Sequence, residues 1–94
     1  MTWKVDFDPR ALKELEKLDK QIQVRIIKFI RQRIEISDDC RNIGFPLKGK
    51  LSGLWKYRVG DYRLICQIEH KKLRVLVINV GHRKNIYKNF KIVK

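Results

Sequence analysis

The sequence predicts an α+β fold, in which a small, mostly antiparallel four-stranded sheet packs on two N-terminal helices. Three observations predict it. Apolar and charged residues alternate over residues 3–7, apolar residues recur at three- and four-residue steps over residues 9–36, and short apolar runs broken by turns fill residues 54–80. The expected order is strand, two helices, three strands and a short C-terminal tail or helix. A chain of 94 residues supports one hydrophobic core, so residues 1–94 are expected to form a single domain.

The N-terminal third contains the first strand and both helices. Trp3, Val5 and Phe7 alternate with charged residues and predict a half-buried strand. Asp8 is placed to cap a helix that starts at Pro9, and Asp19 breaks or caps that helix. A second helix is expected from about Lys20 to Ile36, with an apolar stripe formed by Ile22, Ile26, Phe29, Ile30 and Ile34. The stripe could be a seam for a partner, but it suits packing against the sheet better.

The remaining elements are a loop and three strands. Ser37–Pro46 is rich in turn-forming residues and predicts a loop. Leu54–Val59 and Tyr62–Ile68 predict strands joined by Gly60-Asp61, a two-residue turn of type II′. The last strand is expected over Arg74–Val80 and is ended by Gly81.

The predicted hairpin has two chemically different faces. Side chains alternate along a strand, so one face becomes the core, formed by Trp55, Tyr57, Val59, Tyr62, Leu64, Cys66 and Ile68. The other face carries Lys56, Arg58 and Arg63. Arg58 lies directly opposite Arg63, and like charges in that position repel. A bound phosphate would relieve the repulsion through charge-assisted hydrogen bonds, although the two arginines could also splay apart in solvent.

The net charge is strongly positive and unevenly distributed. The chain carries +13, of which residues 1–47 contribute +2 (ten basic, eight acidic) and residues 48–94 contribute +11 (thirteen basic, two acidic). A merely solubilising charge would not be segregated in this way, so we expect a polyanionic partner. A second polar cluster, with His82, Arg83 and Tyr87, follows the last strand and could converge on the cationic hairpin face if that strand is its neighbour. Equally, His82 could be an ordinary surface residue and Tyr87 could pack under the tail.

Several classes of chemistry are excluded or disfavoured. The basic half has only Asp61 and Glu69 as carboxylates, and no histidine or cysteine pair has ligand spacing, so no metal and no cofactor are expected. Two isolated cysteines do not form a disulfide framework, and no signal peptide or membrane span is recognisable, which favours the cytoplasm. The Lys, Arg, His and Tyr side chains suit a phosphodiester with a built-in nucleophile, which RNA supplies as its 2′-hydroxyl.

Four segments resemble the RelE/ParE toxin superfamily, in the expected order over nearly the whole chain. They are Phe7–Leu15, Pro46–Leu51, Leu54–Arg63, and Val80–Arg83 with Tyr87. The resemblance implies a toxin that cleaves mRNA in the ribosomal A site through 2′-hydroxyl attack. It also implies an acidic RelB-like antitoxin as partner, contacts with mRNA and rRNA, and contact with operator DNA only through the antitoxin.

The resemblance also implies roles for single residues. Lys56 would be the general base, and Arg58 and Arg63 would hold the phosphate. Arg83 would stabilise the transition state or assist the leaving group, and Tyr87 would stack on and orient the nucleotide. Lys48, Lys50, Lys84 and Lys88 would bind RNA. Arg58 and His82 both stand where the best-known RelE branch has lysine. An arginine is an awkward proton donor, so His82 could share the acid role with Arg83.

Two other functions fit the same sequence. One is a ParE-like inhibitor of DNA gyrase, which has no evident need for Lys56 together with His82, Arg83 and Tyr87. The other is a non-catalytic nucleic-acid-binding module, in which the cationic residues would contribute interchangeably. An enzyme would instead show sharply unequal effects when these residues are replaced.

Overall fold

A computed structural model describes residues 2–86 of the chain. Its helices are α1 (Pro9–Glu16) and α2 (Lys20–Phe29), and α2 continues into a π-helical segment, η1 (Ile30–Ile34). Three short 3-10 helices follow: η2 (Cys40–Ile43), η3 (Gly49–Leu51) and η4 (His70–Lys72). The strands are β1 (Lys4–Phe7), β2 (Phe45–Pro46), β3 (Trp55–Val59), β4 (Tyr62–Glu69) and β5 (Arg74–His82).

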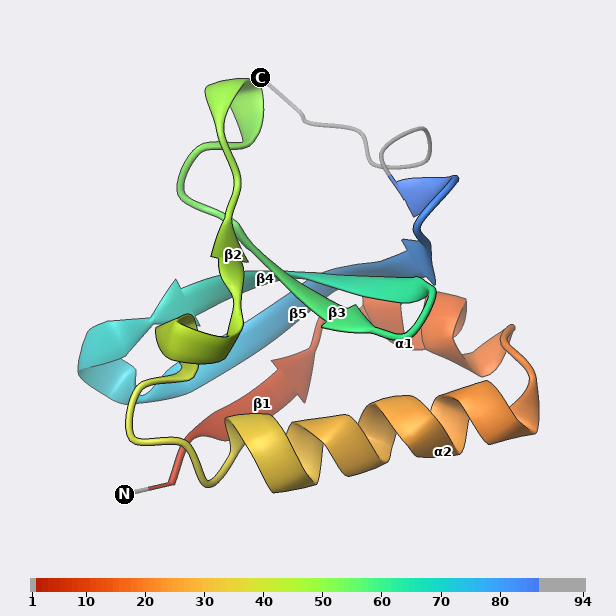
Figure 1. Ribbon diagram of the computed structural model, residues 1–94, viewed down its shortest axis with the longest axis horizontal. Coiled ribbons are helices and arrows are strands. Elements are labelled where there is room, and N and C mark those ends of the chain that lie inside the picture. Colours follow the sequence, from red (N-terminus) through yellow and green to blue (C-terminus); the bar gives the residue numbers. More distant parts are fainter. Residues whose placement is uncertain (1, 87–94) are drawn as a thin grey trace.

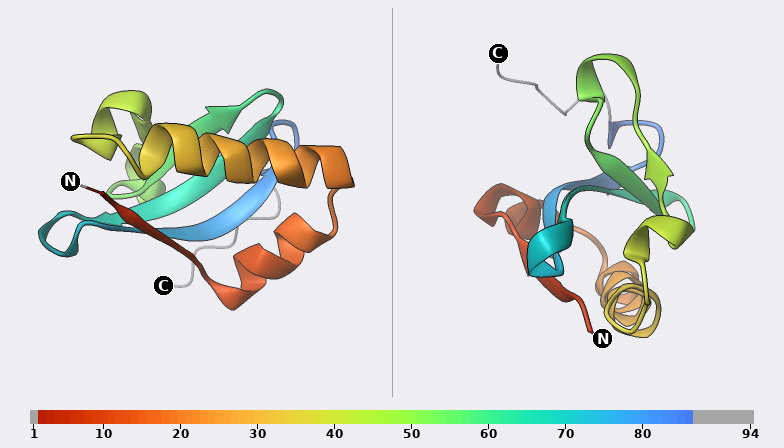
Figure 2. Two further views of the ribbon diagram at one scale, coloured as in Figure 1. Left: turned by 90° about the horizontal axis from the view of Figure 1, so that it is seen from below. Right: turned by 90° about the vertical axis from the view of Figure 1, so that its left-hand side faces the viewer.

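The strands form one sheet in the order β1-β5-β4-β3-β2. β1 pairs with β5 in parallel, and every other neighbouring pair is antiparallel. Both helices lie against one face of the sheet, whereas the β2–β3 connection and the segment after β5 rise from the opposite face (Figure 1). The two views in Figure 2 show the same layering. The α+β class with helices packed on one face is therefore confirmed.

The sheet differs from the sequence prediction in two respects. The sheet has five strands rather than four, because Phe45–Pro46, predicted as loop, pairs with Trp55 and Lys56 at the edge of β3. Such a two-residue strand is too short for an alternating pattern to be visible. Gly81 does not end the last strand, which continues through His82. The absence of a side chain at Gly81 instead admits Ile86, whose Cδ1 would lie 3.1 Å from a Cβ at that position.

The helices begin and pack largely as predicted. The Asp8 carboxylate accepts a hydrogen bond from the Arg10 N–H at 3.2 Å, and Pro9 occupies the first turn. The long helix ends with the π-helical turn at Ile34, short of the expected Ile36. Its apolar stripe faces the sheet, with Ile26, Ile30 and Ile34 buried, so the core interpretation of the stripe is confirmed.

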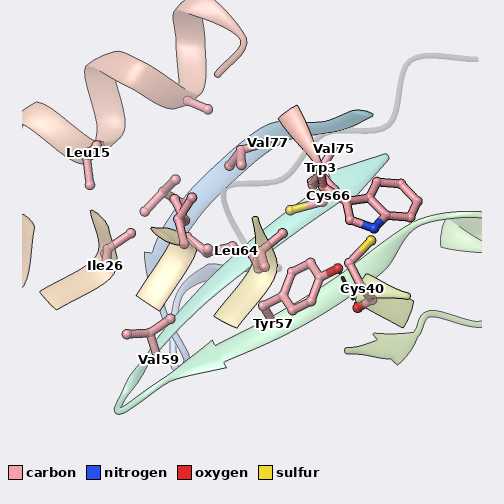
Figure 3. Close-up of a cluster of buried hydrophobic side chains, with 14 residues drawn as sticks. Trp3, Leu15, Ile26, Cys40, Tyr57, Val59, Leu64, Cys66, Val75 and Val77 are labelled. Carbon is pink, nitrogen blue, oxygen red and sulfur yellow. Dashed lines mark hydrogen bonds between the residues drawn. The ribbon is translucent and has the colours of Figure 1, made fainter. Parts of the chain in front are cut away.

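The core lies between the helices and the sheet (Figure 3). Leu64, Cys66 and Val77 contribute fully buried side chains from the sheet. Tyr57 is also buried, and its hydroxyl donates a hydrogen bond of 2.8 Å to the Cys40 carbonyl. This bond joins β3 to the chain that leaves the long helix, and satisfies a phenol that would otherwise be unpaired in an apolar interior.

The β3–β4 hairpin has the predicted register. Val59 pairs with Tyr62 and Arg58 with Arg63. Gly60 has a φ of 60°, whereas Asp61 is not among the residues with positive φ. This combination is the one that a type II′ turn requires, and it matches the right-handed twist of the two strands.

Candidate functional site

The candidate site lies on the face of the sheet opposite the helices, here called the open face. Lys56, Arg58 and Arg63 share this face because they alternate with the core residues of β3 and β4. The open face also contains three buried residues that carry no charge: Ile65, Asn79 and Ile86. Asn79 Oδ1 has no hydrogen-bond partner among the described residues. The open face thus combines buried, mainly apolar side chains with the three cationic side chains of the hairpin.

The paired arginines are held by different neighbours. The Arg63 guanidinium donates through Nη1 to the carbonyls of Gly60 and Tyr62, both at 2.9 Å. Arg58 instead lies with Cζ 4.5 Å from the centroid of the Phe45 ring. The two side chains are therefore separated without any acidic partner, and both remain on the face that the hairpin register predicts.

Phe45 is a site residue that sequence reasoning missed. Its ring is 44% exposed, and Lys56 Nζ lies 5.8 Å from the ring centroid, in addition to the closer Arg58. Contacts of this kind attract a cation to the negative face of the ring. The signal was hidden because Phe45 belongs to the two-residue β2, and only its pairing with Lys56 places it on the open face. An aromatic residue next to a proline, in a segment predicted as loop, was the one hint that the sequence offered.

Arg83 joins the end of β5 to the tip of the hairpin. Its backbone N–H donates to the Asp61 carbonyl at 2.8 Å, and its Nε lies 3.4 Å from Asp61 Oδ1. Both side chains are exposed, at 52% and 70%. Asp61 follows Gly60, whose carbonyl accepts a hydrogen bond from Arg63, so Arg83 lies at the turn beside that arginine.

His82 does not converge on the open face. It pairs with Tyr62, and the two rings meet edge to face with centroids 5.4 Å apart. Since Tyr62 alternates with Arg63, His82 lies on the side of the sheet that bears the helices. Its Nδ1 accepts a hydrogen bond from the Lys84 N–H at 3.1 Å. Of the two possibilities for His82, convergence on the cationic hairpin face is not observed. The strand continues two residues beyond Val80, and the pairing of His82 with Tyr62 sets the direction of its side chain.

The remaining predicted residues lie around the open face or outside the described part. Lys48 and Lys50 are exposed on the β2–β3 connection, and Lys84 is exposed after β5. These two segments rise on the same side of the sheet (Figure 1). Tyr87 and Lys88 lie outside the described residues.

Thiol, metal and membrane chemistry find no support in residues 2–86. Burial raises the pKa of the Cys66 thiol and, with a smaller opposing effect from Tyr57, that of Cys40, so neither is a ready nucleophile. No three His, Cys, Asp or Glu side chains of this part come together in a way that could hold a metal ion. None of its helices is long and apolar enough to cross a membrane.

Comparisons with known proteins agree with this fold. Residues 5–87 match the family model described as ParE toxin of type II toxin–antitoxin system, parDE. Toxin RelG of Mycobacterium tuberculosis is 31% identical over 88 residues, covering 94% of this chain and 99% of RelG. The mRNA interferase toxin RelE of Escherichia coli is 34% identical over 85 residues, covering 89% of this chain and 86% of RelE.

Solved structures give the same result. A crystal structure of the toxin–antitoxin complex RelBE2 from Mycobacterium tuberculosis matches with a TM-score of 0.79 and 29% identity, over 88% of this chain and 93% of the matched chain. The isolated Escherichia coli RelE toxin matches with a TM-score of 0.66 and 30% identity, over 85% and 83%. Family model, relatives and fold agree, so the chain belongs to the RelE/ParE superfamily as a RelE-like toxin of a type II toxin–antitoxin system.

Proposed function

We propose that this toxin is an endoribonuclease that cleaves mRNA in the ribosomal A site, without a metal ion. The observation that carries the proposal is the set of cations around the open face: Lys56, Arg58 and Arg63, with Arg83 at the hairpin tip. A surface selected only for stability would not pair two arginines across a hairpin. Relatives named mRNA interferase, at 34% identity, point in the same direction.

The proposed reaction uses the nucleophile that RNA carries. Lys56 removes the proton from the 2′-hydroxyl, whose oxygen forms a bond to the adjacent phosphorus while the bond to the 5′-oxygen breaks. The products are a 2′,3′-cyclic phosphate (or the 3′-phosphate after hydrolysis) and a 5′-hydroxyl. Arg58 and Arg63 neutralise the charge that develops on the phosphate, a contribution that grows in the transition state. Arg83 stabilises the departing 5′-oxygen.

The departing 5′-oxygen takes up a proton to become the 5′-hydroxyl, and in this proposal His82 shares that acid role with Arg83. In the described part of the chain His82 contacts Tyr62, on the other side of the sheet. Its participation would require the segment after β5 to rearrange on RNA binding. Tyr87 is proposed to stack on the nucleotide, and Lys48, Lys50, Lys84 and Lys88 are proposed to bind RNA backbone, including rRNA.

An acidic RelB-like antitoxin is the proposed protein partner. The solved relatives include RelB–RelE complexes, and a chain of +13 is electrostatically complementary to an acidic segment. Operator DNA would be contacted only through this antitoxin, and the toxin would act in the cytoplasm.

The test is primer extension on a translated mRNA after induction of the wild type, of Arg83→Ala, and of Lys71→Ala as a charge-matched control at the far end of the sheet. Cleavage ends within codons are expected for the wild type and Lys71→Ala, to be lost in Arg83→Ala, and to require translation. Growth arrest with intact mRNA would overturn the nuclease and favour a ParE-like inhibitor of DNA gyrase, the function that the matched family's ParE members raise as the alternative.

A further inference from the structure

A second cationic hollow lies beside the open face, between the long helix and the edge of the hairpin. This α2–β3 pocket has a volume of about 350 Å³. Four cations line it, three from the long helix and one from β3: Arg25, Lys28, Arg33 and Arg58. Of these four residues, only Arg58 belongs to the site described above.

The geometry of the long helix gathers these charges. Arg25 and Lys28 lie three positions apart on one face of α2, and the π-helical segment η1, in which residues five apart are hydrogen-bonded, brings Arg33 to the same side as Lys28. Phe29 packs this side of the helix against β3, because its ring centroid lies 6.1 Å from that of Tyr57. Arg33 Cζ lies 5.8 Å from the Phe29 ring centroid.

The hairpin turn holds the other end of the pocket. A Cβ at Gly60 would lie 3.0 Å from the Arg25 guanidinium, so the absence of a side chain there allows the close approach of Arg25. β2 pairs only with Trp55 and Lys56, and the edge of β3 beyond them is uncovered in the described part of the chain. The pocket is therefore open to a ligand along this edge.

The charges in the pocket are uncompensated. No carboxylate lines it, and within residues 2–86 the four arginine and lysine side chains take no part in the observed ion pairs, which involve Arg41, Arg74 and Arg83. Four like charges around one hollow disfavour the folded state, whereas a phosphate would turn their repulsion into charge-assisted hydrogen bonds.

Arg58 connects the pocket with the open face. Its guanidinium stacks on Phe45 of the open face, yet the same residue lines the pocket. A strand of RNA whose scissile phosphate lies near Arg58 can thus continue over the edge of β3. We propose that the α2–β3 pocket is a second phosphate subsite, which binds the backbone of nucleotides flanking the cleaved one. The inference rests on the proposed nuclease function for the identity of the polyanion.

The test compares two double variants in equilibrium binding to RNA that carries 2′-O-methyl groups and cannot be cut. Lys28→Gln with Arg33→Gln removes two charges from the pocket. Lys71→Gln with Lys72→Gln removes two exposed charges at the far end of the sheet and serves as the matched control. Labelled oligonucleotides of about three and about twelve nucleotides are titrated at several salt concentrations, and thermal melting checks that both variants fold. For single strands each lost phosphate contact lowers the slope of log affinity against log salt by about 0.7.

The pocket variant is expected to bind the longer RNA at least about tenfold more weakly than the control at low salt, with a salt slope smaller by about 1.4. The trinucleotide, which cannot reach both sites, should not distinguish the variants. Equal affinities and slopes for the longer RNA would overturn the proposal. The proposal would also be overturned if the pocket variant lost affinity for the acidic antitoxin but not for RNA, because the pocket would then be a protein-docking site. Wild-type protein that binds this RNA but leaves mRNA uncut on translating ribosomes would instead refute the nuclease and leave the subsite standing.

Discussion

The two faces of the sheet differ in what their side chains do for the folded state. The helix-covered face packs apolar residues against α1 and α2, and its one buried phenol is hydrogen-bonded (Figure 3). The open face carries Lys56 and the paired Arg58 and Arg63. Of these three residues, Arg63 donates hydrogen bonds to backbone carbonyls. Most of the buried apolar side chains thus lie on the helix-covered face, and the cations proposed to act on RNA lie on the other face.

The contrast teaches that function can be removed from this fold without unfolding it. Burial of apolar surface contributes about 25 cal/mol per Å², so replacements on the helix-covered face are expected to lower stability strongly. Exposed cations contribute little to stability, and replacements on the open face should act on RNA chemistry. The four predictions below test this division, in order of decreasing effect.

Lys56→Met should give the largest effect. The substitution keeps an unbranched chain beside Phe45 but removes the proposed general base, so cleavage should fall by about 100-fold or more. Single-turnover cleavage and thermal melting measure the two quantities together, and the melting temperature should stay within about 3 °C of wild type. A variant that melts much earlier, or one that retains full cleavage, would contradict the assignment of Lys56.

Leu64→Ala should have the opposite result, with lower stability and unchanged cleavage. Leu64 is fully buried against the helices, and its truncation should cost about 3 kcal/mol of unfolding free energy. Urea denaturation measures this loss, with Leu12→Ala as the control because Leu12 is 43% exposed. Cleavage per folded molecule should remain near the wild-type value. A strong loss of cleavage in a fully folded sample would break the proposed division between the faces.

Tyr57→Phe should lower stability by about 1–2 kcal/mol at neutral pH, because the buried Cys40 carbonyl loses its donor. Burial also raises the pKa of the Tyr57 phenol, so the folded state favours the neutral form. This contribution is complete below the unfolded pKa near 10 and is lost as the pH rises above it. Urea midpoints between about pH 7 and 11 should therefore fall less steeply in Tyr57→Phe, with a residual slope from the two buried thiols. Urea midpoints that fall with equal slope against pH in the wild type and in Tyr57→Phe would contradict this prediction.

Phe45→Leu should have the smallest effect. Removing a cation–π contact at an exposed site costs about 0.5–1 kcal/mol, which corresponds to about a two- to fivefold fall in kcat/KM if the ring positions Arg58 and Lys56. Phe45→Trp should restore the rate because it keeps the aromatic face, and steady-state cleavage of an RNA substrate measures both variants. Identical cleavage rates for Phe45→Leu and Phe45→Trp would contradict a role of the aromatic ring, because any apolar side chain would then suffice at this position.

The hairpin shows how much of the site could be predicted. Gly60-Asp61 specifies a two-residue turn, the turn sets the register, and the register alone places Arg58 opposite Arg63. Local patterns could not predict the position of His82, because the residue at which β5 ends depends on its pairing with the neighbouring strand. They also failed for Phe45 and the α2–β3 pocket, which bring together residues far apart in the chain.

The sequence by itself determined the α+β class, the helix cap at Asp8, the apolar stripe of the long helix and the two faces of the hairpin. These features depend on side-chain periodicity and turn chemistry, which act over a few residues. Only the tertiary structure decided that β2 brings Phe45 beside Arg58, that His82 lies with Tyr62, and that Arg25, Lys28 and Arg33 meet the hairpin edge. Those contacts join segments whose relative position is set by packing of the whole core, and no local pattern encodes it.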